Sequence, residues 1–268
     1  MGEDVGRESL SLPPELERAL SKVQAPVVKL DSGWVFNCDN RLVFEALPDN
    51  SIDLIITDPP YKDYQSNRPV KHAKVKKILE SDFDLPFFIE QSARVLKPGA
   101  HFYCWCDHLT FPGIVEEMKR QKEEGRKKGR KGESGNFLTY KNMLVWVKNN
   151  HGSGDLRGNY APQHELVIFA VKGERGRPLR GKRPSNIFDA RKVSNYRHNH
   201  GTTKPVEILK KFIEASSEEG KIVLDPYAGT MGVGEAIDGS GREFVMIERE
   251  QGYWEEGKKR LLKFKGEP

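Results

Sequence analysis

Residues 52–61 read IDLIITDPPY, an apolar run followed by a carboxylate, two prolines and a tyrosine. The first six residues are typical of a buried strand, because short continuous apolar runs mark strands that are covered on both faces. Proline fixes its own backbone angles, so Pro59 and Pro60 predict a stiff turn after that strand. Ligands of open α/β sheets bind outside the carboxyl ends of the strands. We therefore expect Asp58 and Tyr61 to face a ligand.

The chain has 268 residues, of which 37% are hydrophobic and 31% are charged, and its formal net charge is +5. This length suits one large α/β domain. The small positive excess favours anionic partners only weakly, so the clustering of basic residues matters more. The cysteines are odd in number: Cys38, Cys104 and Cys106. The sequence shows no apolar leader and no apolar run long enough to span a membrane. These features predict a reduced, cytoplasmic protein.

Apolar runs alternate with amphipathic stretches along most of the chain. We expect strands at 27–30, 34–36, 52–57, 101–106, 144–147, 166–171, 221–224 and 243–247. We expect helices at 15–22, 41–47, 84–96, 114–122, 206–215 and 253–264, and one more after residue 230. This alternation predicts an α/β fold with a mostly parallel, twisted sheet and helices on both faces. The basic stretches 62–77, 123–132 and 173–183 are expected to be loops.

A second strand also ends in an aspartate, since residues 225–230 read DPYAGT. Gly229 allows a ligand to approach the backbone closely. Glu248 follows the next strand, where an acid typically accepts hydrogen bonds from ribose hydroxyls. The stretch lacks the G-x-G-x-x-G pattern and a P-loop lysine, which disfavours a cofactor with a pyrophosphate. An adenosine cofactor without phosphates, such as S-adenosylmethionine, fits better, although an ordinary βα turn would also explain this motif alone.

Taken together, these segments resemble the permuted β class of amino-methylating DNA methyltransferases, in which the catalytic motif precedes the cofactor loop. DPPY at 58–61 is similar to the catalytic motif, and DPYAGT at 225–230 is similar to the cofactor loop. HGTTKP at 200–205 is similar to the family's His-Pro-Thr-x-Lys-Pro segment. The resemblance extends from about Trp34 to Leu262. Met231 stands where the family usually has a second glycine.

The resemblance implies a Rossmann-like S-adenosylmethionine-dependent methyltransferase fold with a small target-recognition insertion. We expect an N-terminal arm at 1–25 and a methyltransferase domain at 26–268. Within that domain, the catalytic part is expected at 34–148, the target-recognition region at about 149–199 and the cofactor-binding part at 200–264.

The activity implied is site-specific DNA methylation, in which S-adenosylmethionine donates a methyl group to the exocyclic N6 of an adenine flipped out of duplex DNA. Aspartate as the first residue of DPPY favours adenine over cytosine N4, which is a tendency of the family. Cytosine-N4 methylation, methylation of RNA or of a protein amide, and a silent nucleic-acid-binding subunit are the alternatives. Cytosine C5 chemistry needs a cysteine that typically follows a proline, and none of the three cysteines does.

In the expected mechanism, Asp58 and the carbonyl of Pro59 accept the hydrogens of the target amine, and Tyr61 stacks on the base. The catalytic residues predicted are Asp58, Pro59, Pro60 and Tyr61. The cofactor-binding residues implied are Asp39, His200, Thr202, Thr203, Lys204, Pro205, Asp225, Pro226, Tyr227, Gly229, Thr230 and Glu248. The DNA-binding residues expected are Lys62, Arg68, Lys71, Arg157, Tyr160, Gln163, Arg180, Arg183, Asn195 and Arg197.

No metal site is expected, because His198 and His200 have the spacing of possible metal ligands but no partner cluster nearby. The expected partner is double-stranded chromosomal or phage DNA, and no membrane. A homodimer, a cognate restriction endonuclease and the recognised DNA sequence stay open.

Overall fold

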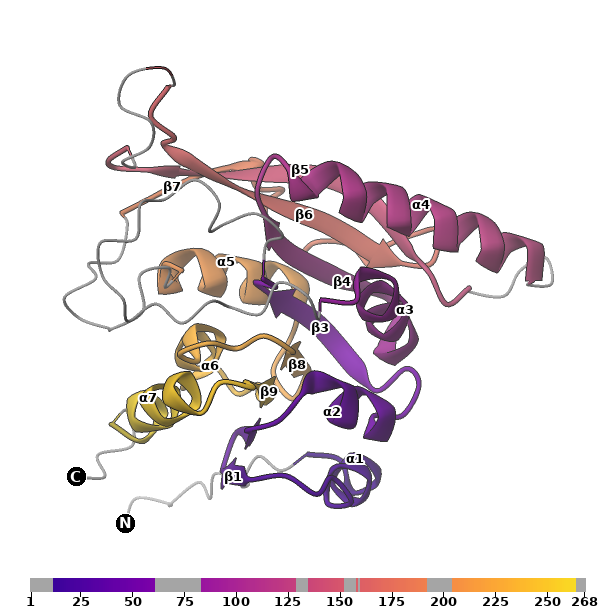
Figure 1. The fold of residues 1–268 in the computed structure, drawn as a ribbon, viewed down its shortest axis with the longest axis vertical. Helices are drawn as coiled ribbons and strands as arrows, with labels where there is room; N and C mark the ends of the chain where they lie inside the picture. Colours follow the sequence, from indigo (N-terminus) through magenta and orange to yellow (C-terminus); the bar gives the residue numbers. More distant parts are fainter. Residues whose placement is uncertain are drawn as a thin grey trace, which may run out of the picture.

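The computed structural model describes residues 12–60, 83–128, 135–151, 158, 160–191 and 204–263. Strands and helices alternate along these ranges (Figure 1). The strands are β1 (Val27–Leu30), β2 (Gly33–Phe36), β3 (Ile52–Thr57), β4 (Leu96–Cys106), β5 (Leu138–Lys148), β6 (His164–Lys172), β7 (Ile187–Ala190), β8 (Ile222–Asp225) and β9 (Glu243–Ile247). The helices are α1 (Pro14–Leu20), α2 (Asn40–Ala46), α3 (Leu85–Val95), α4 (Thr110–Lys128), α5 (Val206–Ser216), α6 (Gly232–Ile237) and α7 (Gln251–Lys263).

The described strands form one sheet in the order β1-β2-β9-β8-β3-β4-β6-β5-β7. The five strands from β2 to β4 in this order are mutually parallel, whereas β1 and β6 run antiparallel to their neighbours. The prediction of a mostly parallel α/β sheet is therefore confirmed. Because β6 is antiparallel to β4, the first residues of β6 lie at the edge where the parallel strands end.

Helices cover both faces of the sheet (Figure 1). Helices α1 to α4 pack into one apolar cluster, and α5 to α7 pack into the other. Neighbouring residues of β4 enter opposite clusters: Cys104 lies in the first and Trp105 in the second. Cys104 and Cys106 are buried, as the sequence predicts for core thiols. The continuous apolar runs therefore reflect strands that are buried on both sides.

The N-terminal helix α1 is part of the core. Leu16 and Leu20 are buried in the same cluster as α2 and α3. The described part of the segment predicted as an arm, from residue 12 to 25, therefore packs against the domain. In the described ranges, no helix is long and apolar enough to cross a membrane.

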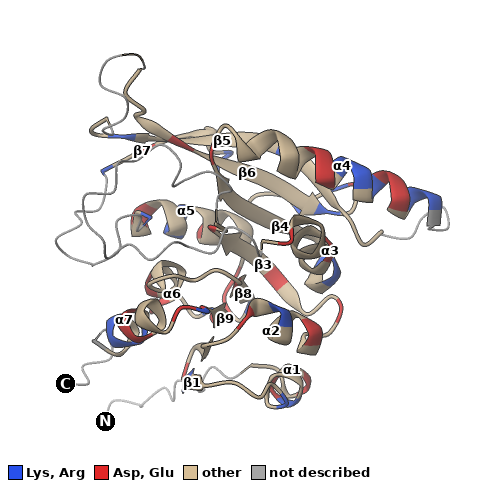
Figure 2. Ribbon diagram, in the orientation of Figure 1, with Lys and Arg blue, Asp and Glu red and all other residues tan. Residues whose placement is uncertain are grey.

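Helix α4 is longer than the sequence predicts, since it continues to Lys128. The prediction of a loop at 123–132 was therefore wrong for residues 123–128. Acidic and basic residues alternate along it (Figure 2). Arg120 pairs with Glu117 and Glu124 within the helix, and Glu174 pairs with Lys122 and Arg126. Such pairs at helical spacing stabilise an otherwise polar helix. Gly125 also suits the packing, since a Cβ there would lie 2.9 Å from the ring of Phe137.

The predicted target-recognition region contains two strands of the sheet. Strand β6 pairs with β4 and β5 inside the sheet, so this part of residues 149–199 belongs to the core rather than to an insertion. Strand β7 follows the basic stretch 173–183 and was not predicted, because its four residues give too short an alternating pattern. Trp146 fixes β7 by donating its indole N–H to the carbonyl of Ala190 at 2.9 Å.

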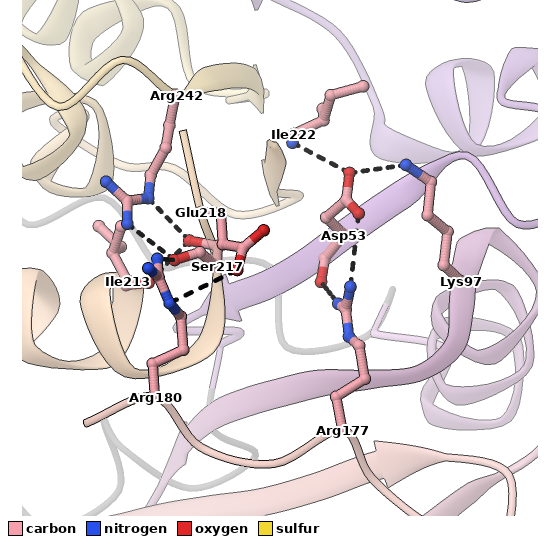
Figure 3. A network of polar contacts seen from close by, with 9 residues as sticks. All are labelled: Asp53, Lys97, Arg177, Arg180, Ile213, Ser217, Glu218, Ile222 and Arg242. Atoms are coloured by element: carbon pink, nitrogen blue, oxygen red, sulfur yellow. Dashed lines mark hydrogen bonds and ion pairs between the residues drawn. The ribbon is translucent and has the colours of Figure 1, made fainter. Parts of the chain in front are cut away.

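A buried carboxylate ties β3 to three other segments (Figure 3). Asp53 is 2% exposed. Its Oδ2 accepts hydrogen bonds from Lys97 Nζ at 2.7 Å and from the backbone N–H of Ile222 at 3.2 Å. Arg177 Nη1 lies 3.6 Å from Oδ1. Asp53 thus links β3, β4, β8 and the segment before β7 at the amino ends of the parallel strands.

Replacing Asp53 by alanine is expected to lower the free energy of unfolding by roughly 2–4 kcal/mol, because two cations and a buried N–H lose their acceptor. This expected loss is smaller than the loss on breaking a fully buried ion pair, because Lys97 and Arg177 are partly exposed. Asp49→Ala is the matched control, since Asp49 forms an exposed pair with Arg94 and such pairs contribute about 0–1 kcal/mol. Urea unfolding followed by circular dichroism measures both, and equal small losses would contradict this role of Asp53.

Candidate active site

Four acids lie at the ends of four adjacent parallel strands. Asp39 follows β2, Glu248 follows β9, Asp225 ends β8 and Asp58 follows β3. Parallel strands in register end at the same edge of a sheet, so these carboxylates form one row. The sequence predicts all four as site residues, and the strand order brings them together.

Two of these acids shape the loop after β8. The carboxylate of Glu248 accepts the backbone N–H of Gly229 at 2.8 Å and that of Glu250 at 2.7 Å. Asp225 accepts the N–H of Tyr227 at 3.1 Å. Gly229 has φ 51°, a left-handed conformation that favours glycine, and a Cβ there would meet no atom within 4 Å. The loop therefore leaves open space above Gly229.

Burial raises the pKa of Asp225 to about 7, and the nearby charges of Asp58 and Glu248 contribute to the increase. Burial also raises the pKa of Glu248 to about 7, although the two backbone N–H groups oppose this change. Carboxyls whose pKa values are raised to near neutrality cluster at functional sites, so Asp225, which is buried, and Glu248, which is partly buried, mark this strand edge as a candidate site.

Lys204 connects Asp58 to Glu165 at the start of β6. Its ammonium lies 2.8 Å from Asp58 Oδ2 and 2.8 Å from Glu165 Oε2, and it is 9% exposed. The same Nζ lies 4.9 Å from the centre of the Trp105 ring, a cation–π contact. Lys148 at the end of β5 reaches Glu165 Oε1 at 2.9 Å. Negative and positive groups thus alternate along the edge in the order Asp58, Lys204, Glu165, Lys148.

Burial alone would lower the pKa of the Lys204 ammonium, but the charges of Asp58 and Glu165 outweigh it and raise the pKa above its usual value. Burial would raise the pKa of Glu165, but the charges of Lys204 and Lys148 lower it. Lys204 and Glu165 are therefore both ionised at neutral pH.

Residues 52–259 match the protein family described as DNA methylase, which comprises the N6/N4 enzymes. This chain belongs to the N6/N4 DNA methylase family. Among its relatives, the type II methyltransferase M.HpaI of Haemophilus parainfluenzae is 28% identical over 84% of this chain and 73% of its own length. The DNA adenine methyltransferase YhdJ of Escherichia coli is 26% identical over 85% of this chain and 82% of its own length.

The fold of this methylase is similar to that of a solved relative. The crystal structure of the M1.HpyAVI–SAM complex matches with a TM-score of 0.62 over 85% of this chain and 98% of its own, at 23% identity. The Rossmann-like methyltransferase fold that the sequence predicts is thereby confirmed.

The described residues that were predicted to bind the cofactor make different contacts in the structure. Lys204 was predicted to bind the cofactor, and the structure places its ammonium on Asp58 and Glu165. Asp39 caps α2 by accepting the N–H of Arg41 at 2.9 Å. The ring of Tyr227 packs edge-on against Phe88. Pro205 begins α5, Pro226 accepts a hydrogen bond from Asn40 at 3.3 Å, and Thr230 is buried.

The predicted DNA-binding residues do not all lie near Asp58. Tyr160 is 96% exposed four residues before β6, and the side chain of Gln163 donates to the carbonyl of Lys148 at 2.9 Å. Arg180 instead donates to the carbonyl of Ser217 beyond the far end of α5, and Arg183 follows it in the same segment.

Ten of the predicted catalytic, cofactor-binding and DNA-binding residues lie outside the described ranges: Tyr61, Lys62, Arg68, Lys71, Arg157, Asn195, Arg197, His200, Thr202 and Thr203.

The prediction of site residues did not include Lys148, Glu165 and Trp105. Glu165 opens an apolar strand and Lys148 closes one, so each reads as an ordinary polar strand end. Their link to the catalytic motif depends on β6 being antiparallel, which the sequence pattern does not fix.

Met231, in place of the family's usual glycine, keeps a glycine-like backbone. It has φ 60° and ψ 38° at the start of α6, and its side chain is fully buried. A Cβ on Gly257 of α7 would lie 2.3 Å from Met231 Cγ. The extra volume of methionine is therefore accommodated by a glycine on the facing helix.

Gly257→Ala is expected to destabilise the methylase by about 1–3 kcal/mol, because the new methyl group overpacks the contact with Met231. Gly252→Ala on the same helix is the control, since a Cβ there meets nothing within 4 Å. That change should leave stability unchanged or raise it by up to about 1 kcal/mol. Thermal unfolding of both variants tests the pair, and a higher melting temperature for Gly257→Ala would be inconsistent with the contact.

Proposed function

We propose that this methylase transfers a methyl group from S-adenosylmethionine to the exocyclic N6 of adenine in duplex DNA. The observation that carries the proposal is the Asp58 carboxylate, held by the buried Lys204 ammonium in one row with Asp225 and Glu248. Family membership supports an amino group as the methyl acceptor. The choice of adenine rests on Asp58 as the first residue of the motif and on YhdJ, which is named a DNA adenine methyltransferase.

The chemistry asks the protein for hydrogen-bond acceptors rather than for a nucleophile. The lone pair of an aromatic amine is delocalised into the ring, so the nitrogen attacks poorly. Asp58 and the carbonyl of Pro59 accept hydrogen bonds from its two N–H groups and draw the nitrogen toward a tetrahedral shape. The carboxylate also stabilises the positive charge that develops on the nitrogen, which is worth most when it is oriented in advance. Lys204 provides this orientation by holding Asp58 Oδ2.

The residues at the ends of β8, β9 and β2 suit S-adenosylmethionine. The bound donor supplies an electrophilic methyl group on a sulfonium. Asp225 would face the ammonium group, Glu248 would accept hydrogen bonds from the ribose hydroxyls and Asp39 would hold the adenine. The three carboxylates and the open space above Gly229 suit a cation that also carries hydroxyl donors.

Cofactor affinity is expected to rise with pH. Below pH 7, the carboxyls of Asp225 and Glu248 are largely protonated, and the cationic cofactor favours their ionised forms. The Kd should therefore fall between pH 5.5 and 7.5, by up to about tenfold per pH unit for each group, below the range where an α-amino group titrates. Calorimetric titration measures the slope. Asp225→Asn should flatten it, and an unchanged slope in that variant would exclude Asp225 as its source.

The same carboxyls make the stability of the unliganded protein fall as the pH rises, opposite to the trend in cofactor affinity. Their pKa values are raised from 3.8 and 4.5 to about 7 in the folded state. Between about pH 4 and 7, the folded protein then binds more protons than the unfolded chain, so this contribution to stability is lost as the pH rises. Cofactor binding should restore it, which thermal unfolding at pH 5 and pH 8 with and without cofactor measures.

The proposed reaction also needs access to the target amine. A base inside a duplex cannot reach Asp58, so the adenine must leave the helix, which costs a few kcal/mol. A homodimer and a cognate endonuclease remain predictions, and M.HpaI, named a type II methyltransferase, supports the latter.

The decisive experiment is single-molecule sequencing of DNA from a methylation-free host that expresses the protein, with mass spectrometry of the digested nucleosides. N6-methyladenine at one short sequence is the expected result. N4-methylcytosine would overturn the choice of base. Label transfer to RNA or protein, with none to duplex DNA, would overturn the proposal itself.

A further inference from the structure

A groove lies between α5 and the sheet, on the face that α5 to α7 cover. Its volume is about 1100 Å³. Tyr103, Leu144 and Phe169 of the sheet line it together with Phe212 of α5, and residues 176–186 form one of its walls. On this face α5 contacts β3, β4 and β7, and α6 contacts β9, and the hollow lies between α5 and the outer strands.

The groove concentrates the positive charge of the protein. Seven lysines and arginines line it against the single acid Glu214, which gives the lining a net charge of +6. The whole chain carries +5, so all remaining residues sum to −1. The seven cations are Lys141, Arg177, Arg180, Lys182, Arg183, Lys211 and Arg242.

Three of these cations are anchored by the protein (Figure 3). Arg180 and Arg242 both donate to the carbonyl of Ser217 at 2.8 Å, just after the C-terminal end of α5. Arg177 pairs with Asp53. These contacts stabilise the helix end and fix a positively charged wall.

Lys182 and Lys211 differ from the anchored arginines. Both are exposed, and neither forms an ion pair with any residue in the described ranges. They face the groove from two elements, the segment before β7 and α5. Two exposed lysine side chains that line a cationic hollow are available to a ligand that carries several negative charges.

The groove is separate from the active site. Helix α5 begins beside Lys204 at the edge that holds Asp58, and its second half lines the groove. The residues of α5 that line the groove run from Lys211 to Ala215, so they lie about 8–14 Å along the helix from its first residue, at 1.5 Å per residue. Arg177 of the lining pairs with Asp53 at the amino ends of the parallel strands, whereas Asp58 lies at their carboxyl ends, so the groove is not the pocket of the target base.

We infer that this groove binds the phosphate backbone of duplex DNA beyond the target site. This inference rests on the proposed function, because the substrate of a DNA methylase is a polyanion that continues on both sides of the target. Duplex DNA rises about 3.4 Å per base pair, so a distance of about 8–14 Å corresponds to roughly two to four base pairs. Phosphate contacts of this kind add affinity and register without reading sequence.

The test compares Lys182→Gln/Lys211→Gln with a charge-matched control, Lys119→Gln/Lys259→Gln, whose lysines are exposed on α4 and α7. Fluorescence anisotropy with a non-target duplex of about 40 base pairs, at several salt concentrations, gives the slope of log Kd against log salt. Each lost phosphate contact lowers that slope by about 0.9, so the groove variant should lose about two units and bind on the order of tenfold more weakly. The control should lose much less.

Two duplexes of about 12 base pairs, each with the target adenine at one end, form the second arm, since each lacks the phosphates on one side of the target. The groove variant should lose less affinity for one of them than for the longer duplex, and its kcat at saturating DNA should equal that of the wild type. Equal slopes for groove variant and control would overturn the inference, as would a loss seen only with RNA. These binding data need no methyl transfer, so they separate this inference from a failure of the proposed function.

Discussion

Asp58→Ala should reduce methyl transfer about 10²- to 10³-fold, because the loss of a preorganised group that stabilises transition-state charge costs this much in comparable sites. Cofactor binding should change by less than about threefold, since the carboxylates of Asp225 and Glu248 remain. Incorporation of labelled methyl groups into DNA measures turnover, and calorimetric titration measures cofactor affinity.

Asp58→Asn tests the charge alone, because it keeps the shape and one acceptor oxygen. It should lose nearly as much activity as alanine. Asp107→Ala is the control at the end of the neighbouring strand, where the carboxylate caps α4 by accepting the N–H of Thr110 at 2.8 Å. That change should cost about 1 kcal/mol of stability and little turnover. Wild-type turnover in Asp58→Asn would contradict the mechanism.

Lys204→Met is expected to lower kcat about 10²-fold with little change in cofactor Kd, because the lysine positions the carboxylate that contacts the amine. Both Asp58 and Glu165 lie 2.8 Å from the same Nζ, so its removal leaves two neighbouring carboxylates without their shared cation. Like charges this close raise the pKa of one of them. The activity of the variant should therefore recover as the pH rises, and kcat as a function of pH measures this shift.

The double variant Lys204→Met/Glu165→Gln separates positioning from a merely structural role. Removing the second carboxylate removes the repulsion, so the acidic limb of the pH profile should return toward that of the wild type. Lys204→Arg, which keeps the charge, should retain more activity than Lys204→Met. A loss of cofactor affinity with unchanged kcat would instead assign Lys204 to the cofactor, as the sequence motif predicts.

Much of the fold follows from local patterns. The strands that carry Asp58, Asp225 and Glu248 are continuous apolar runs that end in an acid, and such runs are recognisable because both faces of a parallel sheet are buried. The end of α4 was predicted six residues too early, because its last turns are held by charge pairs with Glu174, which lies on another segment. Strand β7 was missed because it owes its place to pairing with β5 rather than to its own composition.

The sequence by itself determined the family's motifs, their order and the acids at the strand ends, because each of these is contained in a few consecutive residues. Only the tertiary structure decided the partners of Lys204. Those partners come from β3 and β6, and they meet because β6 runs antiparallel beside β4 and brings its first residues to the edge where β3 ends. The same holds for the basic groove, whose charges come from segments that only the packing of α5 against the sheet brings together.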